Sequence, residues 1–217
     1  GGAVHDSGDT VALFLLRGLE GLGFIKAKAV IVSCGPHTAV RARQLEASVK
    51  TVTQVLNNLR FDKVVPVGVC IDNMKVGSAE TLPDEYNIAP NVHLAEDVLK
   101  GTCEAADDGA LALVLTTIST TFAIFLQRHG DLCSKKLCHV AILGQVCDRD
   151  GEQILMAASA RNDRETSYLQ PDPSYAPFAA DMKTTDYIFR RLQDLGVPII
   201  MSSRFTAYAG SVAASLY

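Results

Sequence analysis

The sequence predicts an α/β protein with a largely parallel sheet and helices on both faces, and three observations support this prediction. Residues 110–115 form a short apolar run without polar alternation, which is typical of a strand buried on both faces. A hydroxyl-rich turn, a helical pattern and a second apolar run at 139–143 follow it, as in a βαβ unit. The same alternation of strands and helices continues along the rest of the chain.

Length, composition and charge narrow the class of protein. A chain of 217 residues with 48% hydrophobic residues can bury a sizeable core, so we predict a single domain over residues 1–217. The net charge of −4 and the scattered basic residues disfavour nucleic-acid binding. No apolar run approaches the roughly 20 residues of a membrane span. Six cysteines without a Cys-x-x-Cys pair, and the absence of a signal peptide, predict a reducing, cytoplasmic compartment.

The first half of the chain follows the predicted alternation up to residue 106. Its elements are expected as helix 10–19, strand 24–33, helix 38–59, strand 63–70 and helix 93–106. Ser7 or Asp9 can cap the first helix. Pro66 cannot donate a ladder hydrogen bond, so its strand is expected at a sheet edge or beside an irregularity. Residues 72–91 lack periodicity and are expected to form a long excursion.

The second half repeats the pattern around the hydroxyl-rich turn. Thr121 is the predicted N-cap of the helix after this turn, and Gly130 is its predicted end. The later elements are expected as strand 139–143, strand 154–157, an excursion at 161–177, helix 178–195 and strand 197–202. Parallel strands end at a common edge, so we expect the strand ends at Ser33, Leu115, Gly144 and Ser202 to converge on one edge of one sheet.

Two carboxylates near the start of the first helix form the first candidate site. Asp6 and Asp9 are three residues apart, and carboxylate oxygens are ligands for a hard cation such as calcium. The same acids also suit helix capping, which the helix dipole favours. Taken alone, the pattern fits capping better than metal binding.

A cysteine and a histidine at a strand end form the second candidate site. Cys34, Gly35 and His37 connect a predicted strand to a predicted helix. A cysteine near a histidine can act as nucleophile and base, although residues of one turn rarely have the required geometry. A small buried thiol is the commoner role for such a cysteine. The amides that open the following helix could instead bind an anion.

The hydroxyl-rich turn is the third candidate site. Thr116 and Thr117 directly follow a strand end, and Ser119 and Thr120 continue the run of hydroxyls. Their hydroxyl and carbonyl oxygens could serve a sugar or a cation. A capped turn between a strand and a helix explains the same residues equally well.

Six segments in one register resemble a known family of hydrolases. They are residues 8–16, 29–43, 64–68, 115–123, 143–145 and 195–201. In order and spacing they are similar to the inosine-uridine-preferring nucleoside hydrolases. Residues 8–16 match that family's Asp-Asp-Ala-x-Ala-Leu helix start, and residues 143–145 match its Met-Gly-Gly turn. The resemblance implies the family's α/β fold, with its C-terminal part and the start of its first strand outside residues 1–217.

The resemblance also implies an activity, since the family hydrolyses the ribosyl N-glycosidic bond with calcium held by aspartates at the ribose. The candidate calcium ligands here are Asp6, Asp9 and Thr116, and the candidate ligand-binding residues are Cys34, Gly35, His37, Thr117 and Gly144. Other family positions are replaced. Val4 and Gly8 stand at family aspartates, Pro36 removes a ribose-binding amide, and Arg204 stands near the family's last calcium aspartate. An arginine there would repel calcium.

These replacements lead us to interpret the chain as a nucleoside-hydrolase-like protein with a decayed site, acting as a binding or structural subunit. The alternative is an active ribonucleoside hydrolase that uses calcium and takes a nucleoside or another ribosyl compound. A third hypothesis is a hydrolase that uses Cys34 as nucleophile. We also expect a homo- or hetero-oligomer, because the apolar surface near Ile199, Tyr208 and Tyr217 would otherwise be exposed to solvent.

Overall fold

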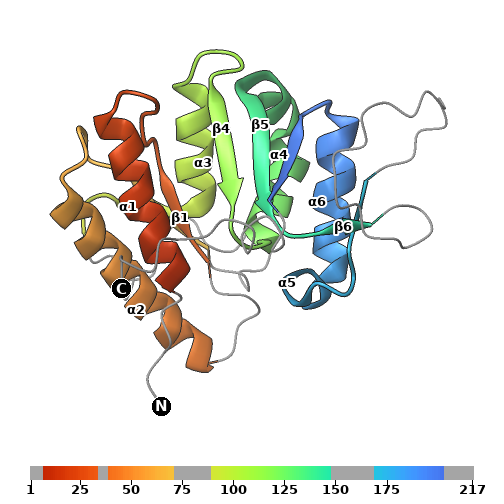
Figure 1. Ribbon diagram of the computed structural model, residues 1–217, viewed down its shortest axis with the longest axis horizontal. Helices are drawn as coiled ribbons and strands as arrows, with labels where there is room; N and C mark the ends of the chain where they lie inside the picture. The colour runs from red at the N-terminus through yellow and green to blue at the C-terminus, as the bar shows by residue number, and fades with distance from the viewer. Residues whose placement is uncertain (1–6, 34–38, 71–88, 148–168, 203–217) are drawn as a thin grey trace, which may run out of the picture. The chain divides into compact units, whose positions relative to one another are not determined.

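Two compact units make up the chain, Gly1–Ala105 and Ala106–Tyr217. The computed structural model describes residues 7–33, 39–70, 89–147 and 169–202, with the side chains of 7–10 and 39–44 left outside the description. Each unit contains a three-stranded parallel sheet with its own helices (Figure 1). The predicted α/β class with largely parallel strands is therefore confirmed. No described helix is long and apolar enough to cross a membrane.

The first unit is built from three helices and three short strands. In chain order they are α1 (Ser7–Gly21), β1 (Val30–Val32), α2 (Ala39–Leu59), β2 (Val67–Val69), β3 (Val92–Leu94) and α3 (Ala95–Glu104). The strands pair in the order β1-β2-β3, and all pairs are parallel. The first helix begins earlier than expected, at Ser7, so Asp9 lies inside its first turn and not at a capping position. The strand β3 was not expected, because two of its three residues fall at the start of a predicted helix.

Helices cover both faces of the first unit's sheet. Val67 and Val69 of β2 are buried in one cluster with Leu45 of α2, which places α2 on their face. On the opposite face α3 lies close to the backbone of Gly68, where an added Cβ would be 2.9 Å from the Ala95 Cα atom. This glycine is therefore required by the close approach of helix and strand.

The prediction that Pro66 puts its strand at a sheet edge is wrong. The strand β2 is the central strand and bonds to both neighbours. Pro66 lies just before its first residue, where its missing N–H is not needed, and its carbonyl oxygen accepts from the Val30 amide at 3.0 Å. On the other side the Val67 amide donates to the Asn91 carbonyl at 2.8 Å.

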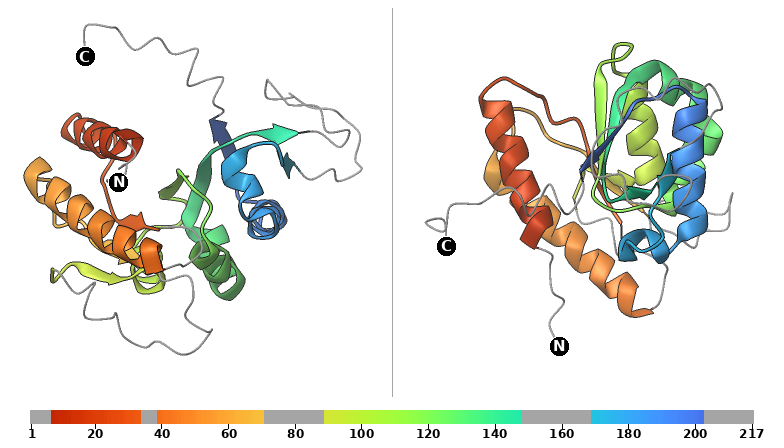
Figure 2. Two further views of the ribbon diagram at one scale, coloured as in Figure 1. Left: turned by 90° about the horizontal axis from the view of Figure 1, so that it is seen from below. Right: turned by 45° about the vertical axis from the view of Figure 1, so that its right-hand side comes forward.

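The second unit contains the βαβ segment predicted from the hydroxyl-rich turn. Its elements are β4 (Leu111–Leu115), α4 (Thr120–Lys136), β5 (Leu137–Leu143), β6 (Val146–Cys147), β7 (Gln170–Pro171), α5 (Ala176–Ala179), α6 (Met182–Asp194) and β8 (Ile199–Ser202). Three strands form a parallel sheet in the order β4-β5-β8, and β6 and β7 form a separate antiparallel pair. The helices α4 and α6 pack together and lie on one side of the parallel sheet (Figure 2).

Helix boundaries in the second unit differ from the predicted ones. Ser119, and not Thr121, caps α4, because its side chain accepts from the Phe122 amide at 3.4 Å. The helix also continues past Gly130 to Lys136, with non-helical angles at His129 (φ −126°, ψ 30°). The predicted helix 178–195 is in fact two helices, because Asp181 caps α6 by accepting from the Thr184 amide at 3.1 Å. Predicted strand 154–157 lies outside the described residues.

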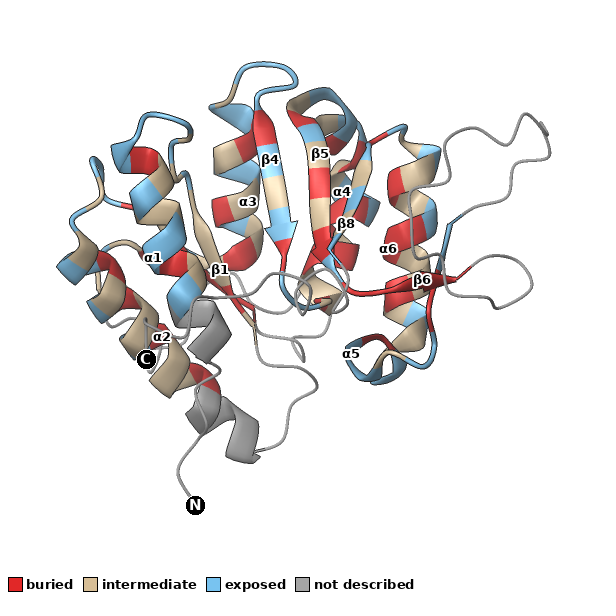
Figure 3. Ribbon diagram, viewed as in Figure 1, coloured by how far each residue is buried: buried red, intermediate tan, exposed pale blue. Residues whose placement is uncertain are grey.

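The two faces of the second unit's sheet differ in exposure (Figure 3). Val140 and Ile142 of β5 are buried on the face covered by α4 and α6. On the opposite face Val114, Leu143 and Ile200 are 61%, 37% and 51% exposed. The expectation that strand 110–115 is buried on both faces is therefore wrong, because β4 alternates between a covered and an exposed face.

Candidate functional site

Three strand ends meet at one edge of the second unit's sheet. Leu115 pairs with Ile142 and Leu143 pairs with Ser202, so β4, β5 and β8 end side by side. The Gly144 amide donates to the Ser202 carbonyl at 3.0 Å and joins two of these ends directly. We call this region the carboxyl edge; it comprises Thr116, Thr117, Gly144, Gln145 and Ser202. The predicted convergence is confirmed for the strand ends of this unit, whereas Ser33 belongs to the first unit.

Gly144 is fixed at the carboxyl edge by the ring of Phe178. A Cβ added to Gly144 would lie 2.0 Å from the Phe178 Cζ atom. The ring is 1% exposed and contacts the rings of Tyr175 and Phe189 with centroids 4.9 and 5.7 Å away. A glycine is therefore required here by close packing, whatever role the position has towards a ligand.

Gln145 is a buried polar side chain with an unused acceptor. The residue is 4% exposed, and its Oε1 atom is buried without a hydrogen-bond partner among the described residues. Its backbone is held in place, because its carbonyl oxygen accepts from the Asp172 amide at 3.0 Å. A buried acceptor without a donor costs about 1–3 kcal/mol, so such a group in a folded protein calls for a specific explanation. A donor supplied by a ligand at the carboxyl edge is one such explanation, and such a ligand would have to displace the atoms that cover Oε1.

Hydroxyl groups stand on the neighbouring strand end. Thr116 and Thr117 follow β4 directly and are exposed, whereas Ser119 is buried and is used to cap α4. The exposed hydroxyls can donate and accept hydrogen bonds, which suits the hydroxyls of a sugar. The turn therefore has a structural part, at Ser119, and a part that is open to a ligand.

Several predicted site residues lie beyond what the structure describes. They are Asp6, Cys34, Gly35 and His37, together with the side chain of Asp9. The candidate nucleophile and its base are among them, so the hypothesis of a Cys34 hydrolase stays a prediction.

The predicted calcium ligands are divided between the two units. Asp6 and Asp9 belong to the first unit and Thr116 to the second. In the described part of the chain, no three His, Cys, Asp or Glu side chains are grouped so that they could hold a metal ion. Asp172, the buried acid near the carboxyl edge, accepts from the Ser174 amide at 2.8 Å through its Oδ1 atom. The described residues alone therefore do not offer calcium the several carboxylates that it prefers.

Sequence reasoning missed Gln145. It lies within the segment 143–145, which was assigned by resemblance to a turn, and only the glycine was taken as a candidate. A polar residue between the apolar Leu143 and Val146 was the available signal. Its burial and its unpaired oxygen depend on β6, β7 and Asp172, which come from distant parts of the chain.

No known protein family and no curated protein matches this sequence. Two solved structures are similar in fold. One is type III effector protein XopQ complexed with adenosine diphosphate ribose, with a TM-score of 0.59, 20% identity, and coverage of 90% of this chain and 54% of that one. The other is effector protein XOO4466, with a TM-score of 0.62, 19% identity, and coverage of 94% and 54%. The chain thus spans about half the length of both, and its fold is α/β with parallel sheets, which is consistent with the predicted nucleoside-hydrolase-like fold.

Proposed function

We propose that this chain is part of a protein that binds a ribosyl compound at the carboxyl edge without cleaving its N-glycosidic bond. The observation that carries the proposal is the buried Oε1 atom of Gln145, which has no donor among the described residues. A ribose hydroxyl is a donor of the required kind. The similar fold of XopQ, whose structure contains adenosine diphosphate ribose, supports this class of ligand.

The neighbouring groups suit a sugar in the same way. Thr116 and Thr117 present hydroxyls on the adjacent strand end, and they can pair with further ribose hydroxyls. Ligands of open α/β sheets bind beyond the carboxyl ends of the strands, which is where these residues lie. A few fixed polar groups of this kind give a site its specificity.

We propose that the N-glycosidic bond is not cleaved, because several residues of the resembled family's active site are replaced in this sequence. Gly8 stands where the resembled family has an aspartate, Arg204 stands near the family's last calcium aspartate, and Pro36 stands where the family has a ribose-binding amide. An active ribonucleoside hydrolase is the alternative, favoured by the resemblance of the six segments. It would need carboxylates beyond those that the described part of the chain brings together.

Calorimetric titration with adenosine diphosphate ribose tests binding, and the variant Gln145→Met tests the proposed contact. Methionine keeps a similar volume but removes the acceptor. One lost hydrogen bond of about 0.5–1.5 kcal/mol should weaken binding by about twofold to tenfold. Gln127→Met, on an exposed position of α4, is the matched control and should bind like the unchanged protein. Equal affinity of the Gln145→Met variant, or no binding by the unchanged protein, would contradict the proposal.

A cleavage assay separates the two functions. The protein is incubated with inosine, uridine or adenosine, with and without added calcium, and released ribose is measured as reducing sugar. We expect no release above the rate without protein. Ribose release that requires calcium and is lost in Asp9→Ala would restore the hydrolase alternative.

A further inference from the structure

The strand β5 contains an irregularity near its first residue, where it pairs with β4. Leu111 pairs with Leu137, but Ala112 pairs with His139, so Cys138 is an extra residue in the ladder. Side chains of a regular strand alternate between the faces, and a bulge breaks this alternation. Leu137 and Val140 are buried on the covered face, which leaves both Cys138 and His139 for the other side. Two successive side chains therefore share one face of the sheet.

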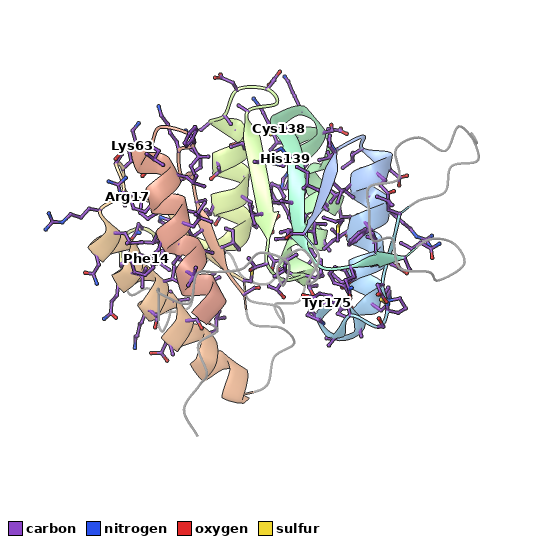
Figure 4. All side chains as sticks on the ribbon, in the orientation of Figure 1. Phe14, Arg17, Lys63, Cys138, His139 and Tyr175 are labelled. Atoms are coloured by element: carbon purple, nitrogen blue, oxygen red, sulfur yellow. The ribbon has the colours of Figure 1, made fainter. Side chains whose placement is uncertain are left out.

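The bulge brings a thiol and an imidazole into contact. The Cys138 Sγ atom lies 3.2 Å from the His139 Nδ1 atom, and the cysteine is exposed. Figure 4 shows both side chains at the beginning of β5, the end opposite to the carboxyl edge. Ala112, the β4 partner of His139, has only a methyl group as its side chain, and Cys138 itself has no partner on β4. The other cysteines of the described chain (Cys70, Cys103, Cys133 and Cys147) are all buried.

We propose that Cys138 is a reactive thiol, activated by His139, and a site of mixed-disulfide formation with small disulfides such as oxidised glutathione. Nucleophile and base within hydrogen-bond distance are the arrangement that this chemistry needs. His139 Nδ1 takes the thiol proton, and the Cys138 sulfur attacks one sulfur of the small disulfide. The S–S bond of the reagent breaks, one half stays on Cys138, and the other half leaves as a thiolate that takes up a proton. The small disulfide is thus the oxidant.

The expected acceleration follows from a base held beside the thiol. The His139 Nδ1 atom lies 3.2 Å from the Cys138 Sγ atom and can take the proton as the sulfur attacks. A positioned base contributes about a hundredfold or more inside an enzyme site, and we expect about tenfold on an exposed strand. This gain is independent of the ribosyl ligand proposed for the other end of the strand.

The test is a time course of reaction between the reduced full chain and oxidised glutathione at pH 7, with the modified cysteines identified by peptide mass spectrometry. Cys138 should be modified about tenfold faster than free glutathione exchanges under the same conditions. His139→Gln should slow modification of Cys138 by a similar factor. His93→Gln, which removes an exposed histidine of β3, should leave the rate unchanged.

A second measurement uses the unchanged protein and needs no variant. In concentrated urea every thiol is accessible, but the contact between Cys138 and His139 is lost. If His139 activates the thiol, Cys138 should react more slowly when unfolded than when folded, despite its greater exposure. A rate that rises on unfolding, or a His139→Gln variant that reacts as fast as the unchanged protein, would overturn the proposal.

Discussion

Replacing Gly144 by alanine is a direct test of the packing beneath the carboxyl edge. The added methyl carbon would lie 2.0, 2.7 and 2.9 Å from three atoms of the Phe178 ring. An ordinary contact begins at 3.4 Å, so ring and strand would have to separate. The ring has little room, because it is 1% exposed and packs edge-on against Tyr175 and Phe189. The strand is also restrained, because the Gly144 amide donates to the Ser202 carbonyl.

Overpacking of a tight core costs about 1–3 kcal/mol, and the closeness of the contact places Gly144→Ala at about 3 kcal/mol. For a chain of this size that corresponds to a fall in the melting temperature of about 6–12 °C. Urea unfolding followed by circular dichroism measures the change in the free energy of unfolding. Gly101→Ala is the matched control, because nothing lies within 4 Å of its added Cβ in α3. That control should be stabilised by about 0.5–1 kcal/mol.

A double variant identifies Phe178 as the cause. Gly144→Ala together with Phe178→Leu should lose less stability than the two single changes added together, with a coupling of about 1 kcal/mol or more. Additive losses would show that the cost arises elsewhere. A Gly144→Ala variant as stable as the unchanged protein would refute the packing argument itself.

Two further predictions concern charge and association. The Lys136 side chain, through its hydrogen bond, lowers the pKa of Asp108 below its ordinary value of 3.8. The ionised Asp108 carboxylate therefore stabilises the fold fully at pH values above 3.8. This stabilisation is lost as the pH falls through the lowered pKa of Asp108 in the folded protein. Asp108→Asn should make the melting temperature less dependent on pH in this acid range. If the predicted oligomer forms through the exposed sheet face, Val114→Lys combined with Ile200→Lys should lower the mass found by sedimentation. An unchanged protein that sediments as a monomer at every concentration would contradict the oligomer.

Local patterns predicted the long elements of the fold well. The helix α2 begins within one residue of its predicted start and ends at the predicted Leu59, because its apolar residues recur at helical spacing over many turns. The strands β4, β5 and β8 were also expected, as apolar runs close to their observed positions. Such signals are contained in neighbouring residues and need no knowledge of distant contacts.

Short elements and special positions depend on partners that the local pattern does not contain. The two-residue strand β7 exists because it pairs with β6, which is more than twenty residues away in the chain. The exposed face of β4 could not be inferred from its apolar run, since an uninterrupted run is also typical of a doubly buried strand. The contact between Cys138 and His139 depends on a bulge, and the bulge depends on the register between two strands.

The same contacts that limit prediction give the carboxyl edge its chemical character. The backbone carbonyl of Gln145 accepts from the Asp172 amide and its side chain is buried, and its neighbour Gly144 is held by Ser202 and Phe178. An acceptor that is fixed before its ligand arrives loses little conformational freedom on binding, so the contact contributes more to affinity. In the free protein the buried Oε1 atom of Gln145 has no donor among the described residues, and this lowers stability. Gln145→Met should therefore raise the free energy of unfolding, by up to about 1–3 kcal/mol, while it weakens the binding of adenosine diphosphate ribose. If Gln145 only filled space, its replacement would lower stability and affinity together. Higher stability with weaker binding therefore identifies a binding role, and a loss of both would refute it.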